Sequence, residues 1–201
     1  MSGILQWLIP SAAGGAVGLT VGSVAIKAPA IVGKIGTFLY EYSRDNIRRR
    51  SEVYDSLRKT FDGDDFDPLY QALGEYANVL DTLNKIKENP AATQNAIYEA
   101  SYKLKIAEDA IRKVPEIVRG GFAAFVEHVA LVTQSGLITY ELANYEFGYY
   151  SILCWDCDPF WDGMDKSSPY WTLYASFVEQ LRVAAKALES NPSEEIAKLR
   201  F

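Results

Sequence analysis

The sequence predicts an all-α protein in which an N-terminal transmembrane helix is followed by a long stalk helix and a cytoplasmic helical bundle. Three observations support this prediction. No charged side chain occurs from Met1 to Ile26. Through most of the remaining chain, apolar residues recur every three or four positions, which is typical of amphipathic helices. No segment shows the sustained two-residue alternation, rich in β-branched residues, that indicates a strand.

The uncharged segment predicts a membrane anchor over residues 1–28. A helix needs roughly 20 apolar residues to cross a bilayer core. Within the segment, Gly14, Gly18 and Gly22 are spaced four apart, so they form one row against which another helix can pack closely. We expect this row to mediate self-association or docking onto other membrane helices. Gly and Ala are only weakly apolar, however, so a helix buried on all sides in a soluble bundle stays open as an alternative.

Residues 29–60 are predicted to form the stalk, a juxtamembrane helix that begins near Pro29. It carries a basic cluster that suits anionic lipid headgroups, made of Arg44, Arg48, Arg49 and Arg50. Because the positive charges follow the apolar segment, the positive-inside rule places the N-terminus outside and the C-terminal domain in the cytoplasm. The predicted location is therefore the inner (cytoplasmic) membrane, with a single pass.

The predicted bundle spans residues 61–190, and its first three helices are separated by turn signals. A turn over 61–67 precedes the first helix, which starts at Asp67-Pro68 and stops at Asn89-Pro90. The second is expected from Thr93 to Val114. Breaks at Pro115 and Gly120-Gly121 place the start of the third at Phe122 and its end at Ser135-Gly136.

The rest of the bundle is rich in aromatic residues. A segment from Leu137 to Trp155 leads into an irregular connector over 156–168, a last helix from Tyr170 to about Leu188, and a polar tail over 191–201. Aromatic side chains dominate protein interfaces as well as cores. We expect a partner-binding surface formed by Tyr149, Tyr150, Trp155, Phe160 and Trp161.

The charge balance indicates which partners to expect. The net charge is −6, which argues against a nucleic-acid surface, because phosphate binding needs clustered Lys and Arg. The expected partners are therefore membrane lipids and other membrane-protein subunits or a second copy of the chain.

Cys154 and Cys157 form a Cys-x-x-Cys pair, for which redox exchange or half of a zinc site are possible functions. Structural zinc usually takes four ligands, and the chain has one histidine and no second such pair. The favoured interpretation is that both cysteines are small buried apolar residues. We predict no cofactor and no metal.

Glu127-His128 interrupts an otherwise apolar helix, and the two side chains point about 100° apart, so they do not both face one pocket. A lone buried carboxylate is costly, and Arg182 lies within the apolar pattern of the last helix. We therefore predict a structural ion pair between Glu127 and Arg182, with a catalytic or ligand-binding role as the alternative.

The acidic run Asp62, Asp64, Asp65 and Asp67 lacks the glycine and glutamate positions of a calcium hand, and a solvated turn explains it. The chain has no Ser-His-Asp order, phosphate-binding glycine loop or His-Glu-x-x-His signature. We predict that the protein is not an enzyme.

The C-terminal half carries a succession of short packing motifs. They are Phe125-Val126-Glu127, Ser135-Gly136-Leu137-Ile138, Glu141-Leu142, Phe147-Gly148-Tyr149, Trp155 and Phe177-Val178-Glu179-Gln180-Leu181-Arg182. This succession resembles an uncharacterised bacterial domain-of-unknown-function family of membrane-anchored helical proteins. The resemblance covers about Arg44 to Arg182. It implies a helical domain behind an anchor and carries no established activity, cofactor or catalytic residue.

The leading functional hypothesis is a non-enzymatic scaffold or accessory subunit of a bacterial membrane complex, assembled through its glycine-rich anchor. The alternative is a membrane effector that forms a pore or disrupts the membrane, for example in a bacterial defence system.

Overall fold

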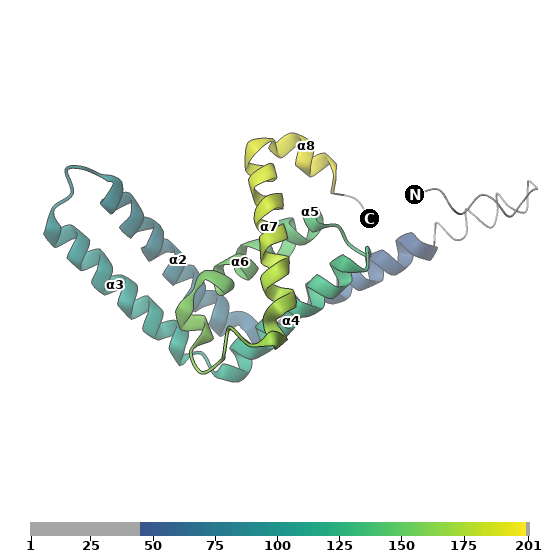
Figure 1. Cartoon of the computed structure of the whole chain (residues 1–201), viewed down its shortest axis with the longest axis horizontal. Helices are drawn as coiled ribbons and strands as arrows, with labels where there is room; N and C mark the ends of the chain where they lie inside the picture. Colours follow the sequence, from purple (N-terminus) through teal and green to yellow (C-terminus); the bar gives the residue numbers. More distant parts are fainter. Residues whose placement is uncertain (1–44, 200–201) are drawn as a thin grey trace, which may run out of the picture. The chain divides into compact units, whose positions relative to one another are not determined.

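The computed structural model describes residues 45–199, and these residues are all helical or irregular, without a strand. Residues 45–61 form the first described helix. It is followed by η1 (Asp64–Phe66), α2 (Asp67–Glu88), α3 (Gln94–Lys113), α4 (Glu116–Gln134), α5 (Tyr140–Ala143), η2 (Asn144–Gly148), α6 (Tyr149–Asp156), η3 (Asp158–Trp161), η4 (Pro169–Trp171), α7 (Thr172–Ser190) and α8 (Pro192–Ala197) (Figure 1). The predicted all-α class is confirmed for this part of the chain.

The predicted anchor and its glycine row, Gly14, Gly18 and Gly22, lie outside the described residues, as does Arg44. Among residues 45–199, no helix combines the length and the hydropathy that crossing a bilayer requires.

Helices α2 and α3 form a hairpin whose bounds agree with the sequence prediction. Pro68 stands in the first turn of α2, where its missing N–H costs nothing, and Asn89 caps the C-terminus. The Thr93 hydroxyl accepts a hydrogen bond from the Ala96 amide at 3.3 Å and so caps α3. At the loop end of the hairpin, Leu83 and Ala100 are buried apart from the main core, so within residues 45–199 the two helices pack there on each other (Figure 1).

Helix α4 passes through Gly120-Gly121 without a break, so the predicted start at Phe122 is wrong. Two glycines in a helix interior cost about 2 kcal/mol relative to alanine. The packing of the following residues outweighs that cost, since Phe122, Val126 and Val129 are buried almost completely in the core. The predicted end at Ser135-Gly136 is confirmed, and Gly136 has the positive φ of 73° that favours glycine after a helix.

The aromatic segment is one helical stretch from α5 to α6, interrupted by the π-helical turn η2. Asn144 begins this turn and Gly148 ends it. A Cβ at Gly148 would collide with Oδ1 of Asn144 and lie 3.0 Å from its Cγ, so a side chain at position 148 would force that of Asn144 to move.

The core takes in residues on both sides of the predicted stalk boundary at residue 60. Leu57 is only 3% exposed, and Phe61 packs its ring against those of Phe125 and Phe147. The C-terminal part of the 45–61 helix is therefore a packed element of the bundle. At the other end, residues 192–197 of the predicted polar tail form the short helix α8.

Candidate functional site

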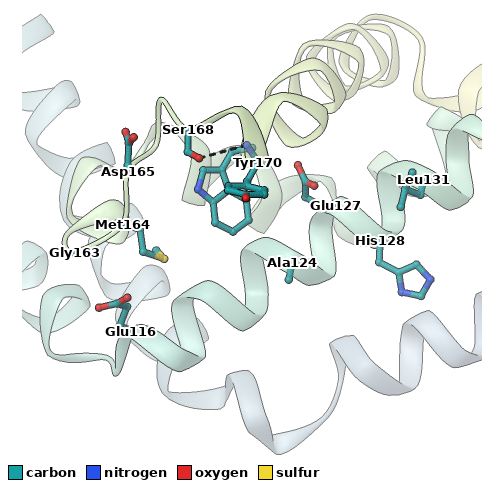
Figure 2. A pocket seen from close by; sticks show the side chains of 11 residues that line it. Glu116, Ala124, Glu127, His128, Leu131, Gly163, Met164, Asp165, Ser168 and Tyr170 are labelled. Atoms are coloured by element: carbon teal, nitrogen blue, oxygen red, sulfur yellow. Dashed lines mark hydrogen bonds between the residues drawn. The ribbon is translucent and has the colours of Figure 1, made fainter.

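A surface groove with a volume of about 650 Å³ lies between α4 and the segment 163–171 (Figure 2). This volume falls within the range of about 300–1,000 Å³ that is usual for ligand pockets. Most of the residues lining it are exposed, so it opens widely to solvent. We call it the α4 groove.

One face of α4 forms the floor of the α4 groove. Glu116 and Glu127 are eleven positions apart, close to three full turns, and Ala124 and Leu131 continue the same face. The opposite face carries the core residues of α4, such as Val126. The amphipathic pattern that packs the helix thus also aligns the two carboxylates in one row.

The segment 163–171 forms the wall of the groove. Arg119, whose side chain is buried (5% exposed), holds the chain just before this segment in place. Its guanidinium donates hydrogen bonds to the carbonyl oxygens of Val114 at 3.0 Å, Phe160 at 2.5 Å and Asp162 at 2.6 Å. Charge-assisted hydrogen bonds of this kind are stronger than neutral ones. Arg119 therefore ties α4 to the irregular segment that enters the groove wall.

Gly163 turns the chain into the groove wall with a φ of 82°, a conformation that side chains rarely adopt. A Cβ at this position would lie 3.0 Å from Oε2 of Glu116. Glycine at position 163 thus lets the wall approach the carboxylate of Glu116 closely.

Glu127 caps α7 and does not pair with Arg182. Its Oε1 accepts a hydrogen bond from the Tyr174 amide at 2.9 Å, in the first turn of α7. Arg182 is eight positions further along α7, about 12 Å at the usual helical rise, and it donates to Asp156 and Glu179 at 2.5 Å each. Because each residue has another partner, the predicted Glu127–Arg182 pair is corrected to two separate interactions.

His128 is exposed, and its ring points away from Glu127 (Figure 2). The hydrogen bond drawn among the lining residues joins the Tyr170 amide to the Ser168 hydroxyl, which accepts it at 3.4 Å. That contact caps η4 and does not pair a nucleophile with a base.

The predicted partner surface is divided between the exterior and the core. Tyr149 is exposed, and Tyr150 and Trp155 are half-buried. Phe160 and Trp161 are 0% and 5% exposed and pack their rings on each other, so the prediction that they form a surface is wrong. Both residues lie in η3, and a single short turn is too brief for periodicity to indicate which side is buried.

Sequence reasoning missed the aromatic side of the α4 groove. Tyr170 is 84% exposed, and Trp171 is half-buried against Trp161, with ring centroids 5.7 Å apart. The signal in the sequence was Ser168-Pro169, a helix-start pair that places the next two residues in a first turn.

Cys154 and Cys157 are free and fully buried, in agreement with the favoured interpretation. Burial raises the pKa of the Cys157 thiol to about 11 and that of Cys154 well above its usual value. Reactive cysteines have a lowered pKa and partial exposure, so these thiols lack both features. Within residues 45–199, no group of three or more His, Cys, Asp or Glu side chains is arranged to hold a metal ion.

The described arginines of the basic cluster lie on the 45–61 helix. Arg48 and Arg49 are exposed, and Arg48 pairs with Glu52 at 2.8 Å. Arg50 is half-buried, and its Nε has no hydrogen-bond partner among residues 45–199.

Comparison of the chain with protein-family models, curated proteins and solved structures finds no match. The resemblance to the bacterial family therefore stays a prediction.

Proposed function

We propose that this chain is a membrane-attached docking protein without catalytic activity. Its N-terminal segment holds it at the cytoplasmic side of a membrane, and its helical bundle is presented to protein partners. The observation that carries the proposal is the uncharged segment from Met1 to Ile26, followed by the basic cluster that ends at Arg50.

The bundle's own features support docking more than catalysis. The α4 groove is an open surface, and Glu127, Asp165 and Ser168 in its lining accept hydrogen bonds that cap helices or turns. The buried thiols of Cys154 and Cys157 lie outside its lining. In addition, α3 carries an exposed row of large side chains spaced four apart, Tyr98, Tyr102 and Ile106, on one helix face.

The glycine row gives the proposal a direct test through assembly size. A leucine at Gly18 fills the groove that close helix packing needs, so Gly18→Leu should shift the full chain to smaller oligomers in mild detergent. Native mass spectrometry measures the change. Leu19→Ala is the matched control, because it changes the size of the side chain next to Gly18 and leaves the three glycines in place. Equal oligomer distributions for Gly18→Leu and the parent chain would contradict this mode of assembly.

A further inference from the structure

The α4 groove has a charge that selects its occupant. None of its eleven lining residues is Lys or Arg, while Glu116, Glu127 and Asp165 contribute carboxylates. The one basic residue on the segment 163–171, Lys166, donates its ammonium hydrogens to the Trp155 carbonyl at 2.5 Å and lies over the Trp155 ring. The groove therefore presents negative charge that no Lys or Arg in its lining neutralises.

The known contacts of these carboxylates leave acceptor capacity for a ligand. Glu127 uses Oε1 to cap α7. Asp165 uses Oδ1 to accept from the amide and the hydroxyl of Ser167, at 3.0 Å and 2.6 Å. Each carboxylate offers about four lone-pair sites, so the second oxygen of each can accept from a further donor. The existing bonds fix the two groups in orientation without saturating them.

Aromatic and apolar side chains line the groove beside the carboxylates. Tyr170, Met164 and Leu131 lie around the groove (Figure 2). Trp171, the next residue after Tyr170, also lines it. A cation attracted to a carboxylate gains further stabilisation from a nearby ring face. An aliphatic stem gains from covering the apolar side chains. Arginine combines a planar cation, several donors and an apolar stem, and it binds carboxylates in bidentate geometry.

The groove is arranged before any ligand arrives. Arg119 fixes the segment that leads into the wall, Gly163 sets the turn, and the ring contact with Trp161 orients Trp171. A site whose side chains are already positioned loses less conformational entropy on binding. Because the groove opens widely to solvent, it suits an extended peptide segment more than an enclosed small molecule.

We propose that the α4 groove binds an arginine-bearing segment of a partner protein, with one guanidinium held by Glu127 and its stem lying along Tyr170 and Trp171, while Glu116, roughly 16 Å away along α4, attracts a second basic residue of the same segment. This inference rests on the proposed docking function and names the chemistry of its partner. The partner segment is basic, and arginine suits the site better than lysine because of its planar, bidentate donors.

The test uses an acetylated tetra-arginine amide as the probe and the full chain in neutral detergent micelles. The four tryptophans are labelled as 5-fluorotryptophan, and the Trp171 resonance is assigned with Trp171→Phe. Titration should shift the Trp171 resonance to saturation, and the affinity should fall as salt rises, because exposed charges are screened. A tetra-citrulline peptide, which has the same shape without the charge, should produce little shift.

Two variants and a charge-matched control localise the binding. Glu127→Gln keeps an oxygen that can accept from the Tyr174 amide. Glu116→Gln changes an exposed residue in the first turn of α4, where no side chain caps the helix. Each should weaken tetra-arginine binding by about two- to fivefold, the range of an exposed ion pair. Glu189→Gln changes the net charge equally on an exposed part of α7 and should leave the affinity unchanged.

Three results would overturn the proposal: equal shifts with tetra-citrulline, equal affinities for Glu127→Gln, Glu116→Gln and Glu189→Gln, or no Trp171 shift at millimolar peptide. None of these readouts depends on whether the chain enters a membrane. Failure of the groove and failure of membrane attachment are therefore distinguishable.

Discussion

At the scale of single residues, Arg119 makes the most consequential contacts in the described part of the chain. It is buried and donates to backbone carbonyls from two segments more than forty positions apart. Removing a carbonyl oxygen from water costs free energy, and a hydrogen bond inside the protein offsets that cost. A buried carbonyl that loses its donor therefore destabilises the folded state. The α4 groove therefore depends on this guanidinium, although Arg119 does not line it.

We predict that Arg119→Met lowers the free energy of unfolding by roughly 3 kcal/mol, because several buried carbonyls lose their donor. Arg112→Met is the matched control, since Arg112 is partly exposed and pairs with Glu108 and Asp109 at the surface. Arg112→Met should lower the free energy of unfolding by no more than about 1 kcal/mol. Urea denaturation followed by circular dichroism measures both, and equal losses would contradict the assigned role.

Cys157 supplies a second prediction at this scale, a dependence of stability on pH. Desolvation raises its pKa to about 11 in the folded protein, from about 9 when exposed. The folded state therefore favours the neutral thiol, and the stability that it contributes is present below pH 9 and lost between pH 9 and 11. Cys157→Ala should flatten the fall of the unfolding free energy in that window. An unchanged slope would show that the thiol does not titrate with folding.

At the scale of elements, two helical glycines give opposite expectations. The π-helical turn η2 leaves no room for a Cβ at Gly148, because Asn144 occupies the space. Gly148→Ala should destabilise the protein by about 1–3 kcal/mol, the usual cost of overpacking. Gly74, inside α2, has nothing within 4 Å of a Cβ, so Gly74→Ala should stabilise by about 0.5–1 kcal/mol. Thermal unfolding reports both signs.

The control for the Gly148 prediction is the double variant Asn144→Ala/Gly148→Ala, which removes the colliding side chain. It should recover part of the loss caused by Gly148→Ala. If Gly148→Ala alone matched or exceeded the stability of the parent chain, the steric account of η2 would be wrong.

The helices of the hairpin were predictable from sequence because their signals are local. Asp67-Pro68, Asn89-Pro90 and Thr93 cap or stop helices through contacts within a few positions. The continuity of α4 was not predictable, because it depends on burial against elements far along the chain. A pair of glycines is therefore weak evidence for a helix boundary where the residues of the next turn are completely buried.

The α4 groove was only partly predictable for the same reason. Glu127 was identified as a carboxylate that needs a partner, but its partner is the backbone of α7 rather than the side chain of Arg182. From the sequence, a partner for a buried carboxylate is chosen by its charge. The sequence does not show that the N-terminus of another helix lies next to that carboxylate in the fold. Trp161 was taken for surface because an irregular connector has no periodicity from which to infer its buried side.

At the scale of the whole molecule, the described bundle and the N-terminal segment carry different parts of the account. The bundle presents an acidic and aromatic groove, and Arg119 holds the segment that leads into its wall. The uncharged residues from Met1 to Ile26 carry the proposed attachment to lipid. Attachment would confine the groove to a membrane surface, where a bound partner is held at a raised effective concentration.

The most direct measurement of the central proposal is the fractionation of the full chain from cells, followed by alkaline carbonate extraction. The account predicts that the chain sediments with membranes and resists extraction. A Val17→Asp/Val21→Asp variant should move to the soluble fraction, because each charge costs about 3 kcal/mol at the centre of a bilayer. Recovery of the parent chain as a soluble monomer in detergent-free buffer would contradict the proposal.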